Sequence, residues 1–432
     1  MKTARSNIGF SLATLLSGSV LAQVVVLLAY PVVTRLFSPE DFGLFNVFYS
    51  YIEVLIILST GKYELALPVA EDDAEAKAVA RLSLWLNGVV SSLLLAVIAF
   101  LIGFDALPGK TDDLGLVALL VPFMVFFSGT SRIYSFLFNR YKQYRPIAAS
   151  DIVGASAGSL LKIGFGMLAS SFLWLFRWGL PLATVLGQAA ANVNYLLRLR
   201  RLPQAISPSR VELKRVAAKF RNFPLFTMPK DFVSSFSYNL PFLWLALYFD
   251  KAEVGLFALA LTFTFRPANI INTAMERVFY VRTVERVRSH QPVLRDLGRL
   301  VLCLNAVAVP VCLLLFLFAE PLFGFFFGNR WNGCGLYVRM LLPWTLVVLT
   351  SSSLSFLPNI FSTQGKEFVF YIVLLVLRIV SLWVGLSTGS FPLAIMLFSA
   401  SGAVVSLLLI IWYFWQIHCR YESNGCRLDE RQ

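Results

Sequence analysis

About twelve apolar stretches of bilayer-spanning length constrain this chain of 432 residues more than any other feature. A spanning α-helix needs about 17 to 25 mostly apolar residues. Hydrophobic residues make up 58% of the chain and charged residues only 14%, a composition that excludes an ordinary water-soluble protein. We therefore predict an all-α polytopic membrane protein with little room for a soluble domain. The stretches cover residues 8–33, 42–60, 82–104, 114–138, 147–168, 179–197, 223–249, 254–275, 300–319, 336–357, 368–386 and 391–415.

Lysine and arginine divide unevenly between alternate loops, which predicts the orientation of the chain. Loops rich in these residues stay on the cytoplasmic side of a membrane. The first stretch continues more than a turn beyond a signal-peptidase-like segment at 20–22, so we expect a retained helix. With both termini in the cytoplasm, the outer loops hold few basic residues. These are Arg35, Lys110, Arg177, Lys251 and Arg330.

The net charge of +13 does not indicate a nucleic-acid partner, because the excess lies in short loops beside helix ends and no binding motif accompanies it. Such loops suit the anionic head groups of membrane lipids. The five cysteines form no Cys-x-x-Cys pair and the two histidines stand alone. We therefore predict no metal and no cofactor.

An internal repeat divides the chain into halves. Residues 37–45 resemble residues 249–257, with the same first Phe and the same Gly-Leu-Phe ending. Ser38 and Asp250 can each cap a helix, and an acid follows three residues later in both segments. Two parallel six-helix lobes around a central cavity are the natural interpretation. The predicted domains are an amino-terminal lobe at 1–197, a basic cytoplasmic linker at 198–222, a carboxy-terminal lobe at 223–415 and a cytoplasmic tail at 416–432.

Charged and polar residues inside the predicted helices gather on the first two helices of each half. The second helix carries Glu53 and Glu64 on one polar face, the seventh carries Asp231 beside Lys230, and the eighth carries Arg266. A charge at the centre of a membrane helix costs roughly 2.5 to 3.5 kcal/mol, so these groups should line water or pair with each other. Pro224 and Pro229 also place kinks or hinges in the seventh helix.

The cationic surplus favours an anionic cargo. Structural pairs within Lys62 and Glu64, or within Lys230 and Asp231, remain an alternative explanation. The candidate substrate-binding residues are Lys62, Lys162, Lys230, Arg266 and Arg378. The candidates for ion coupling are Glu53, Glu64 and Asp231.

Several segments resemble the oligosaccharide flippases of bacterial O-antigen and capsule synthesis. They are the Thr-Arg-Leu-Phe-Ser-Pro-Glu-Asp-Phe-Gly pattern at 34–43, Lys-Tyr-Glu-Leu-Ala at 62–66 and the acidic loop at 71–76. In the second half, Phe-Pro at 223–224, Pro241, Val-Gly-Leu-Phe at 254–257 and Arg-Pro at 266–267 are similar to that family too.

The resemblance implies membership of the multidrug, oligosaccharidyl-lipid and polysaccharide (MOP) exporter superfamily. It implies two six-helix bundles around a cavity lined by helices one, two, seven and eight. The implied cargo is an undecaprenyl-pyrophosphate-linked oligosaccharide, moved across the bacterial inner membrane by alternating access, with other polysaccharide-assembly membrane proteins as partners. The implied protein is a transporter and not an enzyme.

Two other functions stay open from the residues. One is a cation-coupled drug exporter of the same superfamily, which the cationic balance argues against. The other is a membrane polysaccharide polymerase or ligase. Such enzymes need a large extracytoplasmic loop, whereas the longest one expected here covers only about residues 320–335.

Overall fold

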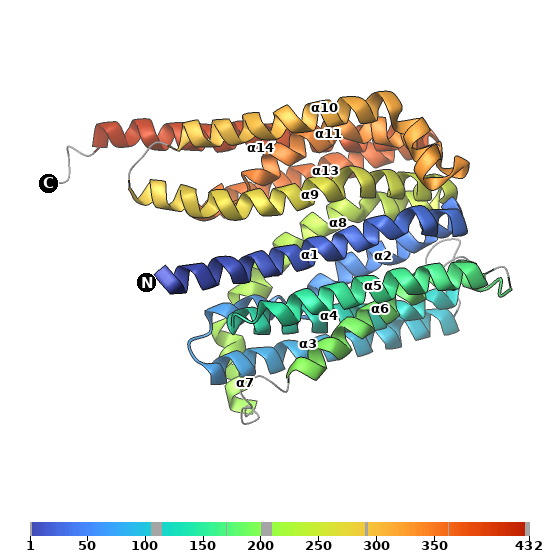
Figure 1. Cartoon of the computed structure of the whole chain (residues 1–432), viewed down its shortest axis with the longest axis horizontal. Helices are drawn as coiled ribbons and strands as arrows, with labels where there is room; N and C mark the ends of the chain where they lie inside the picture. Colours follow the sequence, from blue (N-terminus) through green and yellow to red (C-terminus); the bar gives the residue numbers. More distant parts are fainter. Residues whose placement is uncertain are drawn as a thin grey trace. The chain divides into compact units, whose positions relative to one another are not determined.

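The computed structural model describes residues 2–104, 115–169, 171–199, 210–289, 293–361 and 363–427, and every regular element in these ranges is helical (Figure 1). The predicted stretches at 114–138, 223–249 and 336–357 run beyond one helix into short helical pieces and turns, and residue 114 lies outside the described residues. Each stretch still has one long helix as its main part. In the first half these are α1 (Lys2–Leu36), α2 (Pro39–Ser59), α3 (Asp73–Gly103), α4 (Leu120–Arg140), α5 (Tyr144–Leu168) and α6 (Leu175–Leu199). In the second half they are α8 (Met228–Trp244), α9 (Lys251–Arg288), α10 (Leu294–Phe327), α11 (Cys334–Ser353), α13 (Gln364–Ser387) and α14 (Phe391–Arg427).

Short helical pieces join or extend the long helices. They are the 3-10 turns η1 (Tyr63–Val69), η2 (Gly115–Leu119), η4 (Leu245–Leu247) and η5 (Asn329–Trp331), the π-helical turn η3 (Phe223–Thr227), and the short helices α7 (Arg210–Lys219) and α12 (Leu357–Phe361). The expected loop at 320–335 is wrong over much of its length, because α10 continues to Phe327 and only η5 and its flanking residues separate it from α11. The apolar composition of this stretch sustains the helix through Pro321.

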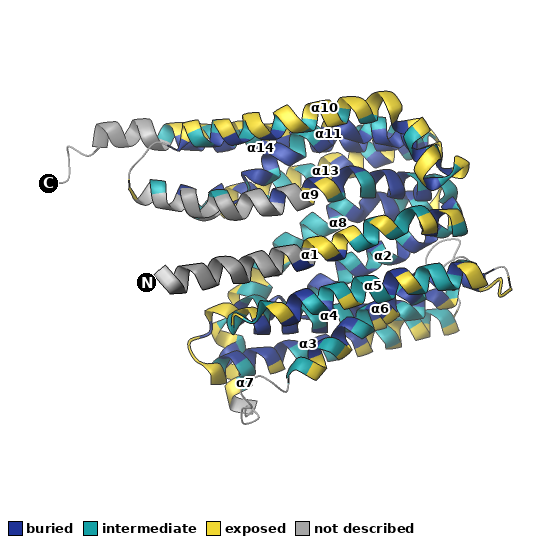
Figure 2. Ribbon diagram, in the orientation of Figure 1, coloured by how far each residue is buried: buried dark blue, intermediate teal, exposed yellow. Residues whose placement is uncertain are grey.

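The long helices have the length and composition of membrane spans. Within the described residues, eight helical segments are long and apolar enough to cross a bilayer. Many of their apolar side chains face outward, as on α10, where Leu302 is 71% exposed and Val307 is 65% exposed (Figure 2). Surfaces of this kind are expected to face lipid. The predicted all-α polytopic fold is confirmed, while the count of twelve spans stays a prediction.

The chain forms two compact units, Met1–Gly255 and Leu256–Gln432. In the first unit, small residues let helices approach closely, as is usual in membrane proteins. Gly158 of α5 faces Gly187 of α6 so closely that a Cβ at Gly187 would meet the Gly158 backbone. Gly18 of α1 meets Ala148 of α5 in the same way. The predicted lobe boundaries describe the sequence repeat and stay predictions.

Helix α2 begins with a capping box that the sequence predicts. The Ser38 hydroxyl accepts a hydrogen bond from the Asp41 N–H at 3.3 Å, and the Ser38 N–H donates to the Asp41 carboxylate at 2.8 Å. Pro39 occupies the first helical position. The equivalent Asp250 accepts a hydrogen bond from the Ala252 N–H at 3.2 Å at the start of α9. The two ends of the repeat therefore use similar local chemistry.

Two glycines of the repeat also contact each other's helix backbone within the first unit. A Cβ at Gly43 would meet the carbonyl oxygen of Lys251, and a Cβ at Gly255 would meet the carbonyl oxygen of Pro39. The contacts are reciprocal because Gly43 and Gly255 are equivalent positions of the sequence repeat, and each meets the residue four positions before the other. Only glycine leaves room for this crossing.

In the second unit, α10 packs against α11, and α14 packs against both α11 and α13. Its core near one end is built around Phe356, Leu357 and Tyr413, which are almost fully buried. Gly385 of α13 approaches Ala394 of α14 without room for a Cβ. These contacts position Arg378 of α13 within the unit.

Candidate functional site

The hairpin between α2 and α3, residues 60–72, carries the most distinctive charged group of the first unit. Lys62 follows α2 directly and its Nζ lies 2.7 Å from Asp231 Oδ2 in the first turn of α8. The Lys62 side chain is 10% exposed and that of Asp231 is 37% exposed. The pairings weighed from the sequence, Lys62 with Glu64 and Lys230 with Asp231, therefore miss the contact that folding creates.

The backbone of this hairpin is unusual. Helix α2 ends at Ser59, and both Gly61 and Lys62 adopt left-handed conformations with φ of 60°. A positive φ is strained for a residue with a side chain and marks positions that the surrounding structure holds for a purpose. Glu64 therefore does not lie on the polar face of the second helix, as predicted, but in η1 beyond it, and Lys62 lies in the turn between α2 and η1.

Glu64 is the most deeply buried candidate. Its residue is 1% exposed, and its Oε2 has no hydrogen-bond partner in the described part of the chain. A buried carboxyl oxygen without a partner is costly and is retained chiefly where it serves a function. Glu53, one of the other candidates, is half-buried on α2, and its backbone carbonyl accepts a hydrogen bond from Ser235 Oγ of α8 at 3.0 Å. Helix α8 thus contacts α2 at Glu53 and the turn that follows α2 at Lys62.

The hairpin is held by an arginine that the sequence did not single out. Arg140, in the last turn of α4, donates through Nη1 to the carbonyl oxygens of Leu67 at 3.0 Å and Ala70 at 2.6 Å. Its Nη2 lies 3.5 Å from Asp73 Oδ1 at the start of α3. One guanidinium therefore satisfies the end of η1 and the beginning of α3, as its planar set of donors allows. Its position at the end of an apolar stretch was the available signal.

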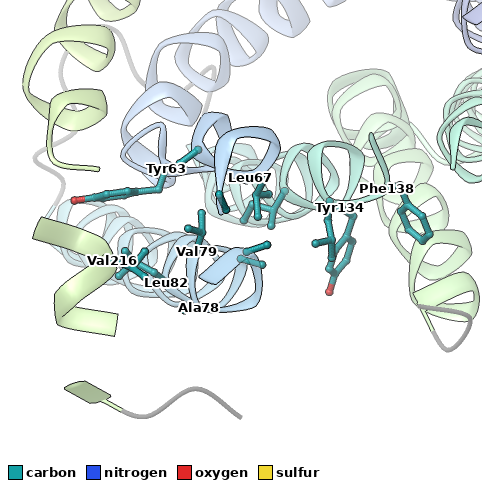
Figure 3. Packing of buried hydrophobic residues seen from close by; sticks show 14 of the residues in the cluster. Tyr63, Leu67, Ala78, Val79, Leu82, Tyr134, Phe138 and Val216 are labelled. Atoms are coloured by element: carbon teal, nitrogen blue, oxygen red, sulfur yellow. The ribbon is translucent and has the colours of Figure 1, made fainter. Parts of the chain in front are cut away.

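The short helix α7 fastens the hairpin from another side. Val216 enters the same apolar core as Leu67, Val79 and Phe138 (Figure 3). The hydroxyl of Tyr63 donates to the Ala217 carbonyl at 3.2 Å. The basic linker and the acidic loop that the sequence displays are thus packed against one another.

An ion-pair cluster adds to this attachment. Lys219 Nζ lies 2.8 Å from Glu71 Oε1 and 2.5 Å from Glu75 Oε1. These hydrogen bonds raise the pKa of the Lys219 ammonium. The pairs are partly exposed, so they steer the position of α7 more than they stabilise the fold.

Lys162 lies in a separate pocket of the first unit. Its ammonium stands over the Phe45 ring, 4.8 Å from the ring centroid, in a cation–π contact. The pocket is partly open and is otherwise lined mostly by apolar groups. The lining residues are Val26, Ala29, Tyr30, Val33, Phe42, Phe45, Ser159, Lys162 and Leu180.

The remaining cationic candidates occupy three further positions. Lys230 is half-buried in the first turn of α8, beside Asp231. Arg266 is half-buried in the interior of α9. Arg378 is 2% exposed on α13, where its guanidinium lies 4.8 Å from the Trp344 ring and 4.3 Å from the Phe398 ring. Their predicted role in substrate binding stays a prediction.

The family profile described as "Polysaccharide biosynthesis protein" matches residues 32–335, which is more than half of the chain. The chain belongs to this family. Succinoglycan biosynthesis transport protein ExoT of Rhizobium meliloti (strain 1021) is 22% identical over 334 residues, which are 76% of this chain and 64% of that protein. The chain therefore spans less than two thirds of the length of this relative.

Solved structures of transporters share the fold of this family member. The lipid II flippase MurJ in an inward closed conformation superposes with a TM-score of 0.70 at 12% identity, covering 96% of this chain and 92% of MurJ. An inward-facing multidrug resistance MATE transporter of the MOP superfamily gives 0.62 at 16% identity, covering 92% and 95%. A MOP superfamily transporter from Pyrococcus furiosus Vc1 also gives 0.62, at 15% identity, with 95% and 94% covered. The predicted polysaccharide biosynthesis family is confirmed, and the chain has the fold of these solved transporters.

Proposed function

We propose that this protein is a flippase that moves an undecaprenyl-pyrophosphate-linked oligosaccharide across the bacterial inner membrane by alternating access. The cargo would supply an O-antigen, capsule or exopolysaccharide assembly line, together with other membrane proteins of that pathway. Both termini are proposed to lie in the cytoplasm, in line with the distribution of basic loops.

The observation that carries this proposal is Lys62. It is a nearly buried cation just beyond the end of a membrane helix, in a left-handed turn, and its ammonium pairs with the partly exposed Asp231. An ammonium suits a phosphate group, because charge-assisted hydrogen bonds to phosphate oxygens are strong. Lys230, beside Asp231, supplies a second cation on α8.

The family and the fold support the same direction. The family is one of polysaccharide biosynthesis, ExoT is described as a transport protein for succinoglycan biosynthesis, and MurJ is described as a lipid II flippase. A polymerase or ligase finds less support, because the described connection between α10 and α11 is too short to build an extracytoplasmic catalytic domain. We therefore propose transport without a chemical step.

A cation-coupled drug exporter is the second candidate. It is favoured by the buried Glu64, a carboxyl that could exchange a proton or bind a cation, and by a fold shared with MATE transporters. In the flippase, Glu53, Glu64 and Asp231 would be the groups through which a coupling ion acts. The two candidates therefore differ in cargo and not in the presence of acidic groups.

The test is translocation in proteoliposomes made with the purified full-length chain. A fluorescent undecaprenyl-pyrophosphate oligosaccharide in the outer leaflet should become inaccessible to a membrane-impermeant quencher faster than in protein-free vesicles. A cationic dye gradient, measured in parallel, should not dissipate faster. Dye transport without lipid translocation would replace the flippase with the drug exporter.

A further inference from the structure

The Lys62–Asp231 pair is asymmetric in how easily its members can part. The Lys62 side chain is 10% exposed, whereas the Asp231 side chain is 37% exposed. A buried charge that loses its partner is strongly destabilising, but a partly exposed carboxylate can turn to water at little cost. Lys62 therefore needs an anion beside it at all times, while Asp231 does not need Lys62.

The two sides of the pair also differ in how they are anchored. Lys62 belongs to a hairpin that Arg140 and α7 hold in place through Leu67, Ala70 and Tyr63. Asp231 lies one turn after the π-helical turn Phe223–Thr227, and π-helical turns are frequent at functional sites. Pro229, in the first turn of α8, removes a further backbone donor there. Exchange at this site would thus move Asp231 and leave Lys62 in place.

From this asymmetry we infer that Asp231 is an internal stand-in for the phosphate of the cargo. The inference rests on the proposed function for its ligand, a lipid-linked pyrophosphate. In the protein without cargo, the Asp231 carboxylate pairs with the ammonium of Lys62. When the cargo enters, a pyrophosphate oxygen takes that position and Asp231 turns away. When the cargo leaves, Asp231 returns and prevents Lys62 from remaining as a buried, unpaired cation.

The chemistry favours this exchange in the stated direction. A pyrophosphate diester carries two negative charges and several acceptor oxygens, so its charge-assisted bonds to an ammonium outweigh those of one carboxylate. Lys230, half-buried and adjacent to Asp231 in the sequence, adds a second positive charge to the first turn of α8. Because Asp231 competes with the cargo, it lowers affinity and speeds release.

The inference predicts a binding phenotype opposite to that of an ordinary contact residue. Asp231→Asn should bind undecaprenyl pyrophosphate about tenfold more tightly than the unmodified chain while releasing it more slowly. Lys62→Gln should bind at least about tenfold more weakly. In the double variant, Asp231→Asn should have no further effect on binding, because the Lys62 ammonium for which Asp231 and the cargo compete is absent.

The experiment measures binding of undecaprenyl pyrophosphate to the full-length protein in nanodiscs, with undecaprenol as the uncharged probe. Glu212→Gln on α7 is the matched control, because it removes one negative charge from an exposed position. Undecaprenol should bind all variants alike. Unchanged or weaker binding of undecaprenyl pyrophosphate by folded Asp231→Asn would overturn the inference.

A second measurement uses the unmodified chain and so does not depend on how a variant folds. Carboxyl footprinting with mass spectrometry should show Asp231 becoming more reactive when undecaprenyl pyrophosphate is added, and unchanged with undecaprenol. Constant or reduced reactivity would contradict the exchange.

The two proposals can fail separately. Tighter binding by Asp231→Asn without translocation by the unmodified chain would remove the flippase and leave the stand-in role. Translocation by the unmodified chain, with no effect of Asp231→Asn on binding, would leave the flippase and remove the stand-in role.

Discussion

The two ends of α2 contact neighbouring helices in different ways. Near its beginning, Gly43 meets the start of α9 through backbone atoms, and no side chain fits between them. Beyond its end, Lys62 meets the start of α8 through a single ion pair of 2.7 Å. No other group can replace the backbone atoms in the first contact. In the second, under the proposed exchange, another anion can replace Asp231 beside Lys62. In the proposed flippase, the backbone contact would preserve the fold, and the ion pair would be replaced when the cargo binds.

The largest expected effect comes from filling the fixed end. Gly43→Leu would push a side chain into the Lys251 carbonyl and should destabilise the protein by about 3 kcal/mol, with much of it lost before purification. Thermal unfolding followed by size-exclusion chromatography would measure this. Gly88→Ala on α3 is the control, because no atom lies within 4 Å of the added Cβ. Equal stability of both variants would show that the crossing is not tight.

A smaller effect is expected from loosening the hairpin at the replaceable end. Arg140→Ala leaves the carbonyls of Leu67 and Ala70 without their donor and should cost about 2 kcal/mol. Arg140→Lys should recover only part of this, since an ammonium cannot reproduce a planar set of donors. Unfolding in detergent gives the comparison. Full recovery by lysine would mean that charge and not geometry holds the hairpin.

Removing the exchangeable cation should affect transport more than folding. Lys62→Gln should lower the rate of lipid translocation at least about tenfold, equivalent to roughly 1.4 kcal/mol, while Asp231 turns to water at little cost to stability. Translocation per folded protein is the measurement, with Lys77→Gln in α3 as the control. A variant that unfolds at lower temperature but translocates normally would assign Lys62 to the fold alone.

The smallest effect is expected at the exposed attachment of α7. Lys219→Glu places a negative charge beside Glu71 and Glu75 and should cost less than about 1 kcal/mol. Because the interaction is screened, the difference from the unmodified chain should shrink in high salt. Combining it with Glu75→Lys should restore part of the loss. A large, salt-independent cost would indicate that α7 is held by this cluster and not by Val216.

The sequence predicts the fold well because the membrane imposes simple rules. Each apolar stretch has a long helix as its main part, and the sequence of Ser38, Pro39 and Asp41 predicted the helix cap. The repeat drew attention to Gly43 and Gly255, although only the structure brings their backbones together.

The site was less predictable because its contacts join distant parts of the chain. Lys62 and Asp231 were both candidates, but their pairing depends on a left-handed turn that ends α2 early. Arg140 looked like one basic residue among many in a cytoplasmic loop, and its role depends on where η1 ends. Helical periodicity could not predict these, since it describes neighbours along one element only.

The most direct test of the central claim is the translocation rate of a fluorescent undecaprenyl-pyrophosphate oligosaccharide in proteoliposomes, with and without unlabelled undecaprenyl pyrophosphate as a competitor. The account predicts protein-dependent translocation that undecaprenyl pyrophosphate inhibits, that undecaprenol does not, and that Lys62→Gln largely abolishes. Translocation that is equally fast with Lys62→Gln, or no translocation by the unmodified chain, would contradict it.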